Sequence, residues 1–130
     1  LDESLVSASG TADAIALGAC EIANIKPGRV GGYLEAVRIH DLCVSANIPV
    51  WCGGMLETGI GRAANAVLAS LPGFTLPGDI SASTRFYAQD IVTDPITIHD
   101  GHVTVPRSAG LGFDIDQPFL DQTTTATISA

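Results

Sequence analysis

The sequence predicts an α/β fold in which β-strands and helices alternate. Short apolar stretches end near Asp2, Lys26, Cys52 and Gly78, so successive ends are 24, 26 and 26 residues apart. The segments between them show the spacing of amphipathic helices, and glycine or proline separates strand from helix. Repeated units of this length with parallel strands form either a doubly wound sheet or a barrel.

The first two units are defined by strand ends and helix stops. Residues 1–4 are expected to close a strand, and a helix should follow over about 11–17 before Gly18 stops it. The next strand ends at Lys26. Over residues 33–46 apolar and polar side chains fall on opposite faces, which is typical of a helix that covers a sheet.

The third unit begins with a short apolar strand over residues 49–52. The helix after it is expected to bury one apolar stripe, formed by Ile60, Ala64, Val67, Leu68 and Leu71. Pro72-Gly73 ends this helix, and a last strand is expected over residues 74–76.

The pattern changes in the last third of the chain. Residues 95–106, PITIHDGHVTVP, predict a hairpin with a type I′ turn at Asp100-Gly101. In this register Ile98 faces Val103, and the apolar side of the hairpin lies on the rest of the protein. Residues 107–130 are expected to be loop, with a last strand or a frayed end.

Composition and charge exclude several classes of protein. A chain of 130 residues with 46% hydrophobic residues is long enough for one domain with a buried core. The net charge of -8 argues against nucleic acid or an anionic membrane surface as a partner, since these select clustered Lys and Arg. No stretch approaches the ~20 apolar residues of a membrane span. Three cysteines without metal-type spacing predict buried free thiols in a reducing compartment, with the cytoplasm as the default.

Lys26 and Asp2 are the strongest candidates for chemistry. Lys26 is the only lysine and lies at the carboxyl end of a predicted strand, where α/β proteins build their sites. Asp2 ends the preceding unit, so both side chains are expected to face one opening, as a site or as a structural ion pair. A lysine near a bound divalent cation loses proton affinity, which suits it to move protons on and off carbon. The cation can stabilise the enediolate formed when a proton α to a carboxylate leaves.

A second candidate is the segment formed by Gly53, Gly54, Met55 and Leu56. It follows a strand and precedes a helix, so its backbone can approach a ligand, and the helix start offers N–H groups to a carboxylate. An ordinary tight turn is the alternative reading.

Other polar residues are weaker candidates for a role in a functional site. Glu57 and Arg62 could contact the residues that bind a ligand without touching the ligand itself, or could be capping or surface residues. Asp79 is expected to act in a turn or as a helix cap. His99 and His102 flank an exposed turn, and such histidines are far more often solvated than bound to metal.

Several motifs, taken in order, resemble the enolase superfamily: LDES, ANIKPGRVGGYLEA, IPVWCGGMLETGIGRAANAVLASLP, FTLPGDIS and a late GLG segment. Within it the chain is most similar to the o-succinylbenzoate synthases and N-succinylamino acid (N-acylamino acid) racemases of the muconate-lactonizing subgroup. The resemblance implies a (β/α)7β TIM-like barrel with a capping domain. Residues 1–82 would be the C-terminal half of this barrel, with its last four strands, and residues 83–130 the C-terminal extension to the capping domain.

The resemblance also implies roles for individual residues. Asp2 matches the third carboxylate ligand of the family's Mg2+, which Mn2+ could replace. Lys26 matches the lysine that acts as acid and base on one face of the substrate in racemases and stabilises the enediolate in synthases. Residues 53–56 match the loop that lies against the succinyl or ring portion. The family's KxK lysine pair and first two metal carboxylates belong to earlier strands.

The implied activity is the dehydration of 2-succinyl-6-hydroxy-2,4-cyclohexadiene-1-carboxylate to o-succinylbenzoate in menaquinone synthesis. Racemisation of N-succinylamino acids is the alternative, and both act on a small-molecule carboxylate. The chain would then be a fragment, inactive alone because half a barrel leaves strand edges unpaired, of an enzyme that is homo-oligomeric at full length. A Schiff-base aldolase-type barrel that uses Lys26, or a non-catalytic α/β module, are the remaining alternatives.

Overall fold

A computed structural model of the chain describes residues 1–128 and has the expected alternation of strands and helices. The first part contains, in order, α1 (Ala8–Ala16), β1 (Ala23–Ile25), α2 (Pro27–Val30), α3 (Tyr33–Ser45), β2 (Val50–Cys52) and α4 (Gly59–Ala69). The second part contains a 3-10 turn, η1 (Ser83–Arg85), the strands β3 (Ile98–His99) and β4 (His102–Val103), and α5 (Gln117–Thr123). The predicted α/β class is confirmed.

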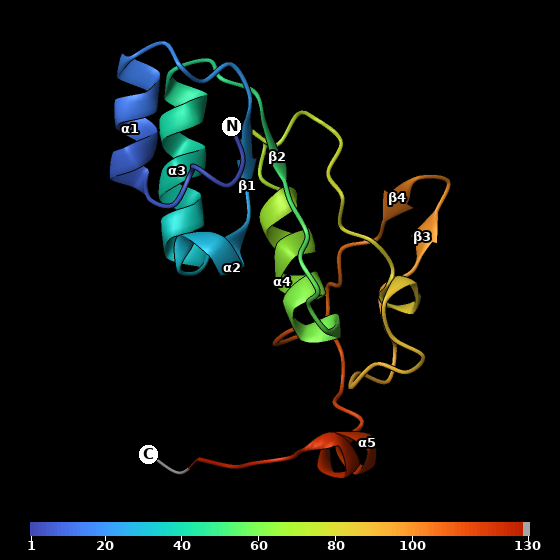
Figure 1. Cartoon of the computed structure of the whole chain (residues 1–130). Helices are drawn as coiled ribbons and strands as arrows, with labels where there is room; N and C mark the ends of the chain where they lie inside the picture. Colours follow the sequence, from blue (N-terminus) through green and yellow to red (C-terminus); the bar gives the residue numbers. More distant parts are fainter. Residues whose placement is uncertain (129–130) are drawn as a thin grey trace.

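β1 and β2 run parallel and side by side (Figure 1), with Ile25 opposite Cys52. The strands expected over 1–4 and 74–76 do not form as strands, although both segments contribute single contacts. Asn24 N donates to Leu1 O at 2.9 Å, and Phe74 makes an isolated parallel bridge to β2. The first segment turns away at once, and Pro77 after the second cannot donate a ladder hydrogen bond.

α1 begins earlier than expected because Ser7 caps it. The Ser7 hydroxyl accepts a hydrogen bond from Gly10 N at 3.1 Å, and the Glu35 carboxylate of α3 accepts one from Ala8 N at 2.7 Å. Gly18, with φ of 65°, ends the helix as predicted. α3 agrees with the expected helix to within one residue, and α1 and α3 pack against each other (Figure 1).

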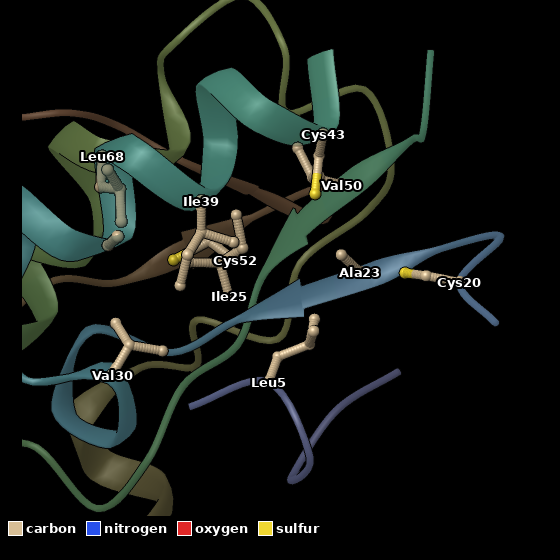
Figure 2. Packing of buried hydrophobic residues seen from close by; sticks show 11 residues of the cluster. Leu5, Cys20, Ala23, Ile25, Val30, Ile39, Cys43, Val50, Cys52 and Leu68 are labelled. Carbon is tan, nitrogen blue, oxygen red and sulfur yellow. The ribbon is translucent and has the colours of Figure 1, made fainter. Parts of the chain in front are cut away.

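The main core lies between the two paired strands and α3 (Figure 2). Ile25 and Cys52 point toward Ile39 of α3, and Leu5 covers β1 from another side. Because side chains alternate along a strand, Asn24 points to the other face of β1. The helix-facing side of the strands is therefore committed to packing, and the opposite side carries Asn24 of β1 beside Trp51 of β2.

The buried face of α4 differs from the expected stripe. Val67 is half exposed, whereas Ala63 and Ala66 are buried and contact apolar residues of the second part of the chain, namely Ile96, Val103, Val105 and Phe113. The prediction followed the large apolar side chains, but here small side chains make room for the incoming segment. Leu68 of the expected stripe is buried and Leu71 packs against the main core, so the prediction was wrong for Val67 and omitted Ala63 and Ala66.

The predicted hairpin is confirmed, with Ile98 opposite Val103 and His99 opposite His102. Asp100 and Gly101 have φ values of 49° and 75°, and a type I′ turn requires both to be positive. Ile98 remains 44% exposed, so the apolar side is covered only in part.

The end of the chain contains a helix where loop or strand was expected. Asp116 accepts a hydrogen bond from Phe119 N at 3.1 Å, and Pro118 lies in the first turn, so this end of α5 is well capped. The tail expected over 107–130 was therefore wrong for 117–123, and residues 129–130 lie outside the described part. No helix within residues 1–128 is long and apolar enough to cross a bilayer. The domain division after residue 82 stays a prediction.

The buried thiols are expected to be unreactive in the folded protein. Burial raises the pKa of Cys43 to about 11 and that of Cys52 to about 12, and both are free thiols with at most 1% exposure. Because the thiolate is the nucleophile, we expect neither to react with Ellman's reagent at about pH 8 until guanidinium unfolds the protein. Labelling of Cys43 or Cys52 in the native state, read by mass spectrometry, would contradict this.

Candidate active site at the ends of β1 and β2

Lys26 follows β1 directly, and Pro27 then begins α2. Pro suits the first helical position because it lacks an N–H and has a fixed φ. Gly53 follows β2 and donates its N–H to Ile25 O at 3.0 Å, so Lys26 and Gly53 lie at corresponding strand ends. The Lys26 side chain is held here with 15% exposure.

The structure brings Asp2 and Lys26 together, as the sequence predicts. Lys26 Nζ lies 2.9 Å from Asp2 Oδ1 and 2.9 Å from Glu3 Oε1. Arg29 of α2 contacts the same Asp2 carboxylate and also donates to the carbonyl of Asn24. The result is a cluster of two cations and two carboxylates beside the end of β1.

Sequence reasoning missed Glu3 and Arg29. The signal for Arg29 was its position three residues after Lys26 in a segment that starts a helix at Pro27, since such spacing returns a side chain to the same side. Glu3 is 77% exposed and adjoins Asp2, and nothing in the pattern distinguishes it from a solvated acid.

The cluster perturbs both of its central groups. Burial acts to raise the pKa of Asp2, but hydrogen bonds from Lys26 and Arg29, together with the nearby carboxamide of Asn24, outweigh it and the pKa is lowered. The hydrogen bonds to Asp2 and Glu3 raise the pKa of Lys26. This direction is opposite to the lowered proton affinity expected for a lysine beside a cation, because here the neighbours of Lys26 are carboxylates.

The Asp2–Lys26 pair should stabilise the fold between two pH limits. The folded pKa of Asp2 lies below its ordinary 3.8, so this contribution is present above that value and lost as pH falls through the folded pKa. The folded pKa of Lys26 lies above its ordinary 10.5, so its contribution is present below that value and lost as pH rises through the folded pKa.

We therefore expect Asp2→Asn to lower the urea midpoint of the full-length protein by a constant amount from about pH 5 to about pH 9. The difference from wild type should shrink toward both extremes. An equal difference at about pH 3 and about pH 7 would show that the ion pair is not its cause.

Gly53 leaves room for its neighbours across the strands. A Cβ at this position would lie 2.3 Å from Asn24 Oδ1 and 2.7 Å from Lys26 Cγ. Asn24 is 1% exposed and its carboxamide makes no hydrogen bond of good geometry within the described residues. Only glycine is therefore compatible with this packing of Asn24 and Lys26.

The next residues of the loop turn toward the segment after residue 78. Gly54 N donates to the Asp79 carboxylate, so Asp79 holds the loop, a role close to the turn or cap that we expected. Gly54, Met55 and Leu56 line a cavity of about 300 Å³ together with Asp79, Ser81, Arg85 and Phe86.

Glu57, just before α4, supports this loop, and Arg62 of α4 holds the segment at Ser81. The Glu57 carboxylate accepts hydrogen bonds from Met55 N at 2.7 Å and from Asn65 Nδ2 at 3.0 Å. Arg62 is 1% exposed and donates from Nη1 to Ser81 O at 2.8 Å and to Ser81 Oγ at 3.0 Å. The surface alternative for Arg62 was wrong.

Metal-ligating side chains do not gather into a complete site. Within residues 1–128 no three His, Cys, Asp or Glu side chains form a group able to hold an ion, and the two hairpin histidines are exposed. Asp2 is an oxygen donor of the type that Mg2+ prefers, and 38% of its side chain is exposed. It can therefore supply one ligand to a divalent cation.

The profile of the family described as enolase C-terminal domain-like matches residues 1–119. That is most of the chain. The chain belongs to the enolase C-terminal domain-like family. The resemblance to the enolase superfamily drawn from its motifs is thereby confirmed.

Relatives and a solved structure agree with this family. The chain is 63% identical to an N-succinylamino acid racemase from Amycolatopsis sp over 128 residues, which are 98% of this chain and 34% of the relative. It is 55% identical to the o-succinylbenzoate synthase of Bacillus subtilis over 120 residues, 92% of this chain and 32% of the relative. A crystal structure of an enolase superfamily member from Listeria innocua superimposes with a TM-score of 0.92 at 44% identity, covering 97% of this chain and 34% of that one.

The chain spans about a third of the length of the curated relatives it matches. The fold of the enolase C-terminal domain and the family are therefore established. The roles of Asp2, Lys26 and residues 53–56 stay predictions.

Proposed function

We propose that this chain is part of an enzyme that removes the proton α to the carboxylate of a succinylated substrate. o-Succinylbenzoate synthase is the activity we favour, with N-succinylamino acid racemisation as the alternative or second activity. The observation that carries the proposal is the 2.9 Å contact between Asp2 and Lys26, in a chain similar to enzymes with both names. Both reactions begin with the same proton removal, so one site can serve either.

Asp2 would hold one side of a divalent cation, Mg2+ or Mn2+. When bound, that cation supplies positive charge that stabilises the substrate carboxylate as its α-proton leaves. Arg29 contacts the Asp2 carboxylate and keeps it in place when Lys26 engages the substrate. The residue set fits a cation only in part, because one carboxylate is not a complete ligand set.

Lys26 can act in either of two chemical roles. As an ammonium it stabilises negative charge that develops on the substrate in a synthase. As a neutral amine it accepts the α-proton on one face of the substrate, which a racemase requires. Residues 53–56 would lie against the acyl portion, where backbone N–H groups and the Met55 and Leu56 side chains are available.

We further propose that the full-length enzyme is a cytoplasmic homo-oligomer. The three buried free thiols suit a reducing compartment. Leu34 on α3 is 80% exposed and Val67 on α4 is 50% exposed, which leaves apolar surface that another subunit could cover.

Assay of the full-length enzyme with both substrates tests the proposed function. We expect turnover of 2-succinyl-6-hydroxy-2,4-cyclohexadiene-1-carboxylate, of an N-succinylamino acid, or of both, lost with EDTA and restored by Mg2+. Turnover of neither substrate would reject the proposal. Trapping of a substrate carbonyl on Lys26 by borohydride, without a metal requirement, would favour the aldolase-type alternative.

A further inference from the structure

We propose that Tyr33, at the start of α3, is a positioning residue whose hydroxyl acts through Asn65 and Glu57 to fix the loop after β2 relative to Lys26. Its effect on turnover rests on the proposed function, because it requires a substrate that lies between Lys26 and this loop. The hydrogen bonds that carry the effect can be tested without turnover.

Three hydrogen bonds connect Tyr33 to the loop. Tyr33 Oη donates to Asn65 Oδ1 at 3.0 Å, and Asn65 Nδ2 donates to Glu57 Oε1 at 3.0 Å. The second carboxylate oxygen of Glu57 accepts a hydrogen bond from Met55 N at 2.7 Å. This relay therefore runs from α3 through α4 to the backbone of the loop.

The donors and acceptors of the relay can have only one order. A carboxylate only accepts hydrogen bonds, so Asn65 must turn its Nδ2 toward Glu57 and its oxygen toward Tyr33. The Tyr33 hydroxyl is then the donor. Burial, and next the charge of Glu57, raise the pKa of Tyr33 above its ordinary 10.0, so the hydroxyl keeps its proton at neutral pH. Its contact with Gly61 O is longer, at 3.4 Å.

Asn65 is the central member of the relay. It is 1% exposed, so its carboxamide depends on protein groups for its hydrogen bonds. Loss of the Tyr33 hydroxyl leaves Asn65 Oδ1 without its partner and removes the contact that orients the carboxamide. The hydrogen bond from Asn65 to Glu57 then weakens, and Glu57 holds Met55 less firmly.

The other end of the relay is fixed close to Lys26. α2 begins directly after Lys26, and only Gly31 and Gly32 separate α2 from Tyr33. Both glycines have positive φ, 93° and 119°, and both donate their N–H to Pro27 O. A turn bonded in this way gives Tyr33 a defined position relative to Lys26. The relay thus joins the segments that follow β1 and β2.

A loosened loop should raise KM and leave kcat nearly unchanged. A loop that occupies its binding position for only part of the time lowers the apparent affinity by that fraction, and saturating substrate restores it. A variant that is merely less stable contains fewer active molecules, which lowers the apparent kcat and leaves KM unchanged. The two roles can therefore be told apart.

The test is Tyr33→Phe in the full-length enzyme, which removes the hydroxyl and keeps the ring that lines a groove of about 350 Å³ beside α3 and α4. We expect KM for the substrate that is turned over to rise by about 2- to 10-fold, as for one hydrogen bond. Glu57→Gln breaks the relay at its last member, because an amide has one acceptor oxygen where a carboxylate has two. Tyr33→Phe added to Glu57→Gln should raise KM no further.

Ser45→Ala is the matched control, because it removes an exposed hydroxyl that bonds Leu42 O at the other end of α3. It should leave KM and kcat unchanged. A fall in kcat at constant KM in Tyr33→Phe, or a full additional rise in KM in the double variant, would overturn the positioning role.

Amide hydrogen exchange of the same proteins tests the relay without substrate. Met55 N–H is bonded to Glu57, so a peptide that contains Met55 should exchange faster in Tyr33→Phe than in wild type. A peptide from α1, which contains no member of the relay, should exchange at the same rate in both. Unchanged exchange at Met55 would overturn the inference. A wild-type enzyme that turns over neither substrate would overturn the proposed function, while the exchange rates would still decide whether the relay holds the loop.

Discussion

Replacement of Lys26 by alanine in the full-length enzyme is expected to lower kcat by about 10³-fold. A loss of this size fits a positioned acid or base, worth about 10² to 10⁴, or a group that stabilises developing charge, worth about 10² to 10³. Lys26 is the only lysine of the chain, and its Nζ is held at the shared end of β1 and β2 by Asp2 and Glu3. Initial rates with the preferred substrate measure the effect.

The loss should be chemical rather than structural. Arg29 still contacts Asp2 when Lys26 is removed, so the thermal midpoint should fall only slightly. Arg38→Ala is the control, because this exposed arginine pairs only with Glu35 on α3. Rates of Lys26→Ala within tenfold of wild type would favour a non-catalytic α/β module, in which Asp2 and Lys26 form a structural pair.

Replacement of Gly53 by alanine is expected to have the second largest effect. The added Cβ would lie 2.3 Å from Asn24 Oδ1, 2.8 Å from Asn24 Nδ2 and 2.7 Å from Lys26 Cγ, and real Cβ atoms do not approach so closely. Asn24 is enclosed, so the loop or Lys26 must move. A displacement of about 1 Å at a reacting group can cost about 10²-fold in rate, and overpacking costs about 1–3 kcal/mol in stability.

Gly10→Ala is the matched control for this substitution. Gly10 lies within α1, and a Cβ there would meet only Ser7 Oγ at 3.4 Å, an ordinary contact. Activity should be unchanged, and the free energy of unfolding should rise by up to about 1 kcal/mol because alanine favours helix. Rates and urea denaturation of both variants make the comparison. A Gly53→Ala enzyme with wild-type kcat would show that Lys26 tolerates displacement.

Local chemistry explains which parts of the fold could be predicted. The hairpin follows from Asp100-Gly101, because few residues adopt two successive positive φ values. α5 was missed although Asp116 and Pro118 are a capping signal, because the threonine-rich sequence after it favours extended chain. The face of α4 could not be read from its own residues, since distant apolar residues decide that Ala63 and Ala66 are buried.

Some residues of the candidate site could be predicted from the sequence and others could not. Asp2 and Lys26 could be paired in advance because parallel units of equal length bring their strand ends together. Arg29 could have been added from its spacing of three residues after Lys26, whereas the contribution of Glu3 depends on how far an exposed side chain reaches, which the sequence does not indicate. The burial of Arg62 could not be predicted from the sequence either, because a buried arginine without a carboxylate partner is rare.

Exchange of the substrate α-proton in D2O, followed by NMR, tests most directly whether Lys26 moves that proton in the racemase reaction. Each enantiomer of an N-succinylamino acid would be incubated separately with the wild-type enzyme and with Lys26→Ala. We expect wild type to exchange both enantiomers, and Lys26→Ala to lose exchange for the one enantiomer whose proton faces Lys26 while retaining it for the other. Exchange of both enantiomers by Lys26→Ala at wild-type rates would contradict the central claim.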